Sequence, residues 1–260
     1  MINWTTRELT TLTNELFDVW RHYTVQKRMD LFVISYNHLK VHKYSNLTDA
    51  ETFTKTHITT LNRRHGSGTA TLYKNKIYVI GGSGESVLTT TSDVPILDLE
   101  EKEFTRGPSL NQSRARHATT LLGDCLYVIG GDGALGQLSS IEKLNVANDD
   151  KEWTLINMPG FTYRHRPVVC AIDEEKFLIA GGTDGYSGYF VDSTSVSMES
   201  SAINTLTSSN SLTFQCCRNT GTAGAPGEAF AIVESEDLKL HIVHFSANNV
   251  LVSIKRFEMR

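Results

Sequence analysis

The sequence predicts an all-β fold built from repeated four-stranded units, and two observations support this prediction. An apolar run followed by two glycines occurs three times, as Ile-Tyr-Val-Ile-Gly-Gly (77–82), Leu-Tyr-Val-Ile-Gly-Gly (126–131) and Phe-Leu-Ile-Ala-Gly-Gly (177–182). The glycine pairs are therefore 49 and 51 residues apart. In two of the three units an aromatic residue follows the second glycine by 22 residues, at Phe104 and at Trp153. Self-similarity at a period of about 50 residues is a sign of a repeat architecture.

Each motif suits a particular place in a repeated sheet. A short apolar run is typical of a strand that is buried on both faces. Two glycines after it allow a sharp turn with positive φ and a close approach of backbone. A late aromatic side chain can fill the space between neighbouring sheets. The combination resembles the kelch repeat, in which a hydrophobic strand ends in a double glycine and a later aromatic residue closes the unit. The resemblance implies a kelch-type β-propeller with the apolar run as an inner strand near the propeller axis.

The start of the chain allows two interpretations. A helix over 6–23 is indicated by apolar residues at helical spacing, and Thr5 and Glu8 would form its capping box. The threonine-rich stretch 5–13 and the alternation through 19–25 instead favour strands. Strands are preferred, but both interpretations remain open.

The remaining elements follow from the repeat, within a single expected domain of residues 1–260. Clear repeats are predicted at 61–109, 111–159 and 161–209. Their strands are expected at 67–72, 76–81, 92–98 and 102–106, then at 117–122, 125–130, 139–145 and 152–157, and finally at 167–172, 176–181, 189–197 and 201–207. The total is about five blades.

Two outer blades are expected to be degenerate. The first, 14–59, has an apolar run at 31–34 that no double glycine follows. The last, 211–260, offers three strands, near 227–233, 238–245 and 250–257. Its fourth strand is expected from residues 1–8, because Ile-Asn-Trp-Thr (2–5) is similar to the fourth-strand segments at 102–105 and 151–154. Pairing both chain ends in one blade would remove the last exposed sheet edge.

Composition narrows the class of protein. Hydrophobic residues make up 40% and charged residues 21% of the chain, and the formal net charge is −4. These values give no reason to expect a nucleic acid or a membrane as the partner. No run of about 18 apolar residues is present, and the first thirty residues lack the apolar segment of a signal peptide. The four cysteines form no CxxC pair, which favours a reduced, cytoplasmic protein.

Basic residues recur at or just before the first strand of four of the expected blades. Arg-His pairs occur at 21–22, 64–65, 116–117 and 164–165, with further arginines beside them. The kelch resemblance implies that this position faces the mouth of the propeller funnel. A ring of guanidinium groups there would suit the carboxylates of an acidic peptide. The alternative is structural, since such residues can also hydrogen-bond neighbouring loops. The predicted partner-binding residues in this position are Arg64, His65, Arg114, Arg116, His117, Arg164, His165 and Arg166.

The loops after the glycine pairs form a second candidate surface. They read Ser-Gly-Glu-Ser (83–86), Asp-Gly-Ala-Leu (132–135) and Asp-Gly-Tyr-Ser (184–187). Loops on a rigid scaffold often carry recognition, and Tyr186 is predicted to be an aromatic anchor for the partner. Asp-Gly is also ordinary turn chemistry, so a purely structural role remains open.

Motifs for catalysis or metal binding are weak. Asp237 and His241 have part of the iron-binding pattern found in some kelch propellers, but the nearest glutamate, Glu234, is one position away from it. The sequence contains no nucleophile elbow and no phosphate-binding loop. We therefore expect no cofactor, no metal and no enzymatic activity.

The predicted function is a scaffold for protein–protein interaction. A partner peptide or loop, acidic in character, would bind on the funnel face, while neither nucleic acid nor a membrane is expected. The alternative is a small-sugar enzyme, because the kelch resemblance extends to sialic acid mutarotases. The Arg-His residues could bind a sugar carboxylate and transfer protons. The oligomeric state is left open.

Overall fold

The computed structural model describes residues 22–28, 30–35, 39–45, 54–84, 89–148, 150–171, 175–180, 193–198, 202–206, 229–234, 239–245 and 251–258. Every regular element in these ranges is a β-strand, and every strand pairing is antiparallel. A search of the same ranges for a helix with the length and apolarity needed to cross a bilayer finds none.

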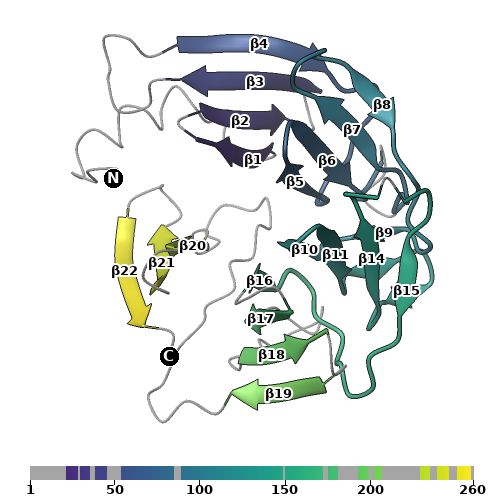
Figure 1. Ribbon diagram of the computed structural model, residues 1–260, viewed down its shortest axis with the longest axis vertical. Helices are drawn as coiled ribbons and strands as arrows, with labels where there is room; N and C mark the ends of the chain where they lie inside the picture. The colour runs from purple at the N-terminus through teal and green to yellow at the C-terminus, as the bar shows by residue number, and fades with distance from the viewer. Residues whose placement is uncertain are drawn as a thin grey trace.

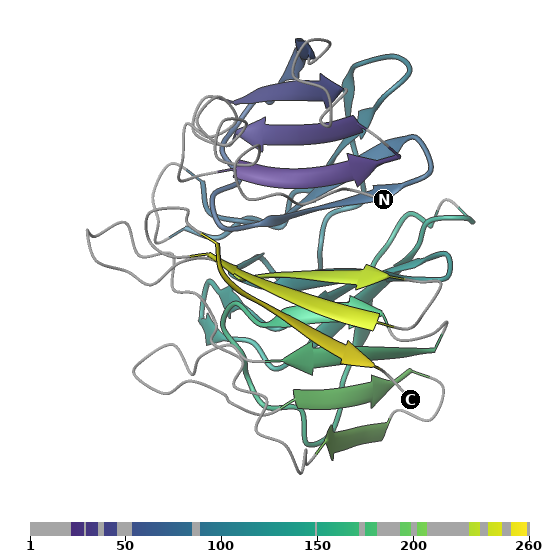
Figure 2. The same cartoon turned by 90° about the vertical axis from the view of Figure 1, so that its left-hand side faces the viewer.

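In the described ranges, five sheets follow one another around a common axis (Figure 1; Figure 2). Four of these sheets have four described strands and the last has three. Their members are β1 (His22–Lys27), β2 (Asp30–Ser35), β3 (Lys40–Ser45) and β4 (Thr54–Thr60); β5 (Thr69–Tyr73), β6 (Lys76–Ile80), β7 (Pro95–Asp98) and β8 (Phe104–Arg106); β10 (Ala118–Leu122), β11 (Cys125–Ile129), β14 (Ile141–Asn145) and β15 (Thr154–Ile156); β16 (Val168–Ala171), β17 (Lys176–Ala180), β18 (Ser193–Ser197) and β19 (Ala202–Leu206); and β20 (Ala229–Glu234), β21 (Lys239–Phe245) and β22 (Leu251–Glu258). We refer to these sheets as blades 1 to 5 in chain order.

The arrangement confirms the predicted fold class, an all-β propeller of four-stranded blades. Strands β1, β5, β10, β16 and β20 lie nearest the axis, and contacts link them in this order from β1 to β20. Blade 5 contains the three predicted C-terminal strands. The N-terminal strand expected to complete it, at 2–5, lies outside the described residues. So does most of the segment 6–23, of which only the end, in β1, is described and is a strand.

The apolar run that ends at each glycine pair is an inner strand, as predicted, and it lies second from the axis. In blade 3 this run is β11, which pairs with β10 on its axial side and with β14 on the other. The second strand is paired along both edges and covered on both faces, so it is the most completely buried and needs the most apolar sequence. The axial strands instead include threonines, and Thr71 of β5 hydrogen-bonds Thr119 of β10 at 2.9 Å.

The hydrophobic core lies between the blades rather than within any one of them. Alternate side chains of a second strand point to opposite neighbours, as the period of a strand requires. In β11, Leu126 and Val128 pack toward blade 2, whereas Tyr127 and Ile129 pack toward blade 4. In β6, Ile77 and Val79 pack toward blade 1, whereas Tyr78 and Ile80 pack toward blade 3. The late aromatic residue has the predicted role: Trp153 is buried against residues of blade 2, and its Nε1 donates to the carbonyl oxygen of Pro108 at 2.9 Å.

The glycine pairs allow the next blade's backbone to approach closely. Gly81 and Gly130 have φ of +56° and +65°, and a Cβ on them would lie 2.6 Å from Arg114 O and 2.9 Å from Arg164 O, in the loops that lead into the next blade. The amides of the second glycines donate to the same two carbonyl groups, Gly82 to Arg114 O at 2.7 Å and Gly131 to Arg164 O at 3.2 Å. Blade 1 has no glycine pair. There the hydroxyl of Tyr23 makes the hydrogen bonds to the next blade: it donates to His65 O and accepts from the amide of Gly68.

Candidate functional site

Two sets of loops meet on one face of the propeller, as the sequence analysis expected. The leading loops (61–68, 107–117 and 157–167) run into the first strand of a blade, and the post-glycine loops (described at 81–84, 89–94 and 130–140) leave its second strand. In blade 3 they form a small sheet, in which β9 (Arg114–Ala115) pairs with β12 (Asp132–Gly133), and β12 pairs with β13 (Gly136–Gln137). In blade 2 Gly66 and Ser83 form the corresponding bridge. We call the surface formed by these loops the loop face.

The strand register shows that the Arg-His pairs do not occupy equivalent positions. Three residues in left-handed backbone conformation, Ser67, Arg116 and Arg166, precede the axial strands of successive blades, with φ of 55°, 56° and 54°. Backbone hydrogen bonds link them around the axis, from Arg116 N to Ser67 O at 2.6 Å and from Arg166 N to Arg116 O at 2.8 Å. Two positions earlier stand His65, Arg114 and Arg164. The pairs 64–65, 116–117 and 164–165 therefore fall in three different registers.

The position two residues earlier is an interior one. His65, Arg114 and Arg164 are all buried. His65 Nδ1 lies 2.7 Å from Gly81 O, and Arg114 NH1 donates to Gly130 O at 2.9 Å, so both side chains bind the carbonyl of the first glycine of a pair. Burial is the main cause that lowers the pKa of His65. The prediction that these three residues contact a partner is therefore wrong. They are buried beneath the surface, where they support the loops.

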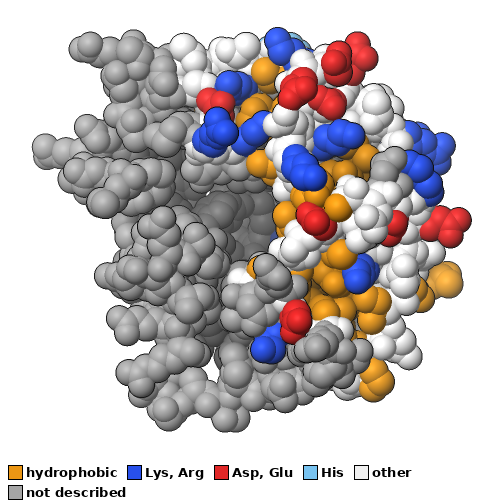
Figure 3. All heavy atoms as spheres, viewed as in Figure 1, with side chains coloured by type: hydrophobic (Ala, Val, Ile, Leu, Met, Phe, Trp, Pro, Cys, Tyr) orange, Lys and Arg blue, Asp and Glu red, His pale blue; other side chains and the backbone are white. Residues whose placement is uncertain are grey.

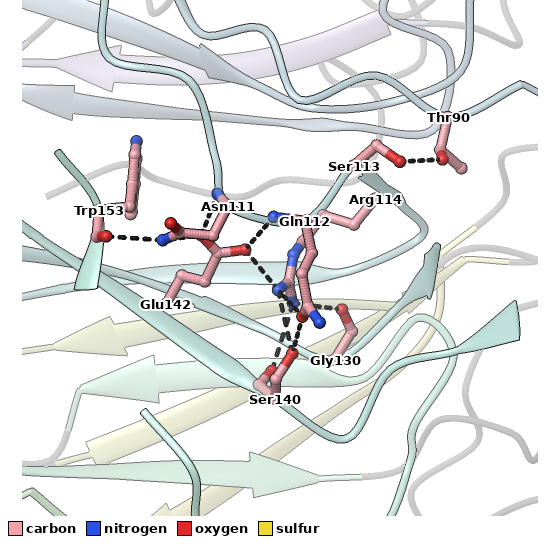
Figure 4. Close-up of polar contacts among 9 residues, drawn as sticks. All are labelled: Thr90, Asn111, Gln112, Ser113, Arg114, Gly130, Ser140, Glu142 and Trp153. Carbon is pink, nitrogen blue, oxygen red and sulfur yellow. Dashed lines mark hydrogen bonds and ion pairs between the residues drawn. The ribbon is translucent and has the colours of Figure 1, made fainter. Parts of the chain in front are cut away.

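Arg114 is the centre of a buried polar network (Figure 4). Its NH2 donates to Glu142 Oε1 at 2.6 Å, and both side chains are fully buried. The carboxylate of Glu142 also accepts hydrogen bonds from the amides of Asn111 and Gln112, at 2.6 and 3.2 Å. Burial lowers the pKa of Arg114, and Glu142 opposes that shift. The network fastens a leading loop to β14, so a partner would meet a prepositioned backbone.

His117 is buried as well, so the prediction that it contacts a partner is also wrong. Its Nε2 lies 3.1 Å from Thr69 Oγ1, and the side chain packs beside the glycine pair of blade 2. Burial, reinforced by the positive charge of Arg114, lowers the pKa of His117 to about 3. The ring is thus neutral at physiological pH and has no exposed surface for a partner to bind.

The accessible polar groups gather around Asp132. Arg116 NH1 lies 2.8 Å from Asp132 Oδ2, and the hydroxyl of Tyr163 donates to Oδ1 at 2.5 Å. His165 Nε2 lies 3.8 Å from Oδ2. The side chains of Arg116, Asp132 and His165 are 31%, 21% and 19% exposed, so solvent reaches the cluster. Tyr163 was not among the predicted residues, and the sequence signal that could have identified it is its place in a leading loop.

Other predicted residues lie nearby or outside the described residues. Arg64 is exposed in the leading loop of blade 2, and its neighbour Arg63 forms an ion pair with Asp93 at 2.6 Å. Arg166 is half-buried next to Arg116. Tyr186 and its loop are outside the described residues. The exposed tip of the β12–β13 hairpin is formed by Leu135, whose side chain is fully exposed.

Charges of both signs are interspersed over the face seen in Figure 3, with hydrophobic side chains between them. No single-sign field covers the described part of this face. Within the same described part of the chain, no three His, Cys, Asp or Glu residues lie close enough together to hold a metal ion. Anion recognition here would depend on individual guanidinium groups with defined geometry.

Comparison with known proteins places these features in a family context. A model of the Kelch motif matches residues 63–111 and 113–157. Alpha-scruin of Limulus polyphemus is 34% identical over 94 residues, which are 33% of this chain and 10% of that protein. Kelch-like protein 25 of Rattus norvegicus is 29% identical over 117 residues, 42% of this chain and 19% of that protein. The chain thus spans about a tenth and a fifth of the length of these relatives.

The solved structure of YjhT is similar in fold. Its TM-score is 0.67 at 11% sequence identity, and the match covers 91% of this chain and 79% of that one. This match corrects one prediction, namely that the chain is not an enzyme. Propellers of the kelch type include the sialic acid mutarotases noted in the sequence analysis, and the chain shares this fold over nearly its whole length. The fold therefore gives no ground for excluding catalysis, and that prediction is corrected.

Proposed function

We propose that the propeller of this kelch-repeat protein is a scaffold for protein–protein interaction. Its loop face binds a peptide or an exposed loop of a partner. The observation that carries the proposal is the convergence of loops from neighbouring blades on one face, with accessible guanidinium groups among them. Arg64, Arg116 and Arg166 come from the leading loops of three successive blades. Such an array suits a partner with acidic side chains, because guanidinium and carboxylate groups form paired hydrogen bonds.

The rigidity of the loops supports this proposal. The leading loop of blade 3 is held by the Arg114–Glu142 pair, by β9–β12 pairing and by the backbone bonds that link Ser67, Arg116 and Arg166. A surface held in place before binding loses little conformational entropy when a partner docks. A cytoplasmic setting belongs to the same proposal, and it accords with Cys125, a half-buried free thiol.

A peptide selection tests the proposal. A phage-displayed library of random peptides is selected against the whole chain, and enriched sequences are synthesised and titrated by fluorescence polarisation. We expect enrichment of Asp- and Glu-containing peptides, and a loss of binding of at least tenfold in Arg64→Gln/Arg116→Gln. Arg106→Gln/Lys102→Gln, which removes two cations at the outer edge of blade 2, is the control and should bind normally. Peptides that bind both double variants equally well would refute the loop face as the binding surface.

A second candidate is supported by the Asp132 cluster. A carboxylate, an imidazole and a guanidinium lie together there, at 2.8 and 3.8 Å. In a sugar mutarotase, a base takes the proton of the anomeric hydroxyl and an acid protonates the ring oxygen, so that the ring opens; an arginine could hold the sugar carboxylate. Proton NMR of freshly dissolved N-acetylneuraminic acid tests this function. A mutarotase should speed the equilibration of the anomers, and Asp132→Ala should abolish the acceleration.

A further inference from the structure

The donors around Asp132 come from two different blades. Arg116 belongs to the leading loop of blade 3, whereas Tyr163 and His165 belong to the leading loop of blade 4. Asp132 itself is on β12, in the post-glycine loop of blade 3. Both oxygens of one carboxylate are engaged, Oδ1 by the Tyr163 hydroxyl and Oδ2 by Arg116, with His165 close to Oδ2. The arrangement has the charge and hydrogen-bond pattern of a receptor for a carboxylate.

We propose that Arg116, Tyr163 and His165 form a carboxylate-binding cradle that the chain's own Asp132 occupies until an acidic side chain of a partner replaces it. The inference rests on the proposed function, and it names the chemical group that the loop face recognises. The partial exposure of Arg116 and Asp132 leaves room for the exchange, because an incoming carboxylate can approach Arg116 from solvent.

The backbone that carries the donors is fixed independently of Asp132. Arg116 is bonded through its main chain to Ser67 and Arg166, and Gly131, next to Asp132, donates to Arg164 O. The Arg114–Glu142 pair, which does not involve Asp132, anchors the same leading loop. Removing the Asp132 side chain should therefore leave a preformed, vacant cradle.

Chemical rescue is the direct test, with acetate as the probe. The melting temperature of the whole chain is measured in sodium acetate and in sodium chloride at equal ionic strength and pH 7. For Asp132→Ala we expect a saturable rise of about 3–5 °C at 0.1 M acetate, because acetate refills the cradle of the folded state only. Wild type, with the cradle occupied, should show no difference between the two salts. Asp132→Ala/Arg116→Gln should lose the rescue.

Two results would overturn the cradle: no difference between the salts for Asp132→Ala, or an equal rise in the Arg116→Gln double variant. If Asp132→Ala does not fold, the isosteric Asp132→Asn keeps the question testable. Fluorescence polarisation with a labelled hexaglutamate peptide should then show tighter binding to Asp132→Asn than to wild type, and weaker binding once Arg116→Gln is added. No gain in Asp132→Asn over wild type would refute the exchange.

The rescue separates the cradle from the proposed function. Acetate rescue without any selected peptide would leave the cradle standing and refute the scaffold. Selected peptides that bind through Arg64 and Arg116, without acetate rescue, would support the scaffold and refute the cradle.

Discussion

Arg114 and Arg116 are two residues apart in one leading loop, yet only Arg116 reaches solvent. Arg114 turns inward to Gly130 and Glu142, whereas Arg116 adopts a left-handed backbone and meets Asp132 at the loop face. At the scale of single residues, therefore, register decides whether a basic side chain supports the fold or is available to a partner. His65, His117 and Arg164 belong with Arg114 in the interior.

The buried state of His117 makes stability depend on pH. Its pKa in the folded protein is about 3, below the 6.5 of an unperturbed histidine. As pH falls below about 6.5 the unfolded chain gains a proton that the folded chain does not, so the free energy of unfolding decreases with falling pH. His117 alone should lower the free energy of unfolding by about 1.4 kcal/mol when the pH falls from 7.5 to 5.5.

Urea unfolding at pH 7.5 and pH 5.5 measures this effect. His117→Asn, which has no titrating ring, should lose less stability than wild type over that interval. Leu135→Ala, at an exposed side chain that carries no titrating group, is the control and should keep the wild-type dependence. An unchanged pH dependence in His117→Asn would show that His117 does not retain its neutral form on folding.

Sequence reasoning found the basic positions but not their register. Arg64 and Arg164 each stand 18 residues before the second glycine of a pair, so sequence spacing alone makes them equivalent. The strand pairing shows one more residue between the paired Ala171 and Phe177 than between the paired Leu121 and Leu126. The extra residue moves Arg164 into register with Arg114. Glu142 was also missed, and its signal was a single acidic residue at the start of an apolar strand.

At the scale of elements, the predictions succeeded wherever a strand has a strong local signature. The strands expected at 125–130 and 176–181 are β11 and β17, each within one residue. Their order within each blade also follows the predicted order along the chain. The two-residue strands β9, β12 and β13 were missed, because they depend on pairing between loops that are distant in sequence.

Trp153 tests the packing between elements. Trp153→Ala should lower the free energy of unfolding by about 3–5 kcal/mol, because the ring fills the boundary between blades 2 and 3 and its Nε1 bonds Pro108. Leu155→Ala, a neighbouring change at a side chain that is 48% exposed, should cost less than about 0.5 kcal/mol. Guanidinium unfolding curves give both values, and equal losses would mean that Trp153 does not hold two blades together.

At the scale of the whole molecule, the residues that stabilise the fold and the loops proposed to bind a partner lie in different places of each repeat. The apolar layers lie between blades and are hidden from solvent, whereas the leading and post-glycine loops of neighbouring blades combine on one face. The opposite ends of the axial strands carry short turns, such as Lys74–Asn75 and Gly123–Asp124. A partner that binds the loop face touches loops from several blades at once, which no single blade could offer.

Hydrogen–deuterium exchange with a selected acidic peptide tests most directly where the partner binds. With the peptide bound at saturation, amides in 110–117, 130–138 and 161–167 should exchange more slowly, and the same peptide should give no change in Arg64→Gln/Arg116→Gln. Protection confined to the turns at 73–76 and 122–125, on the opposite face, would contradict the account.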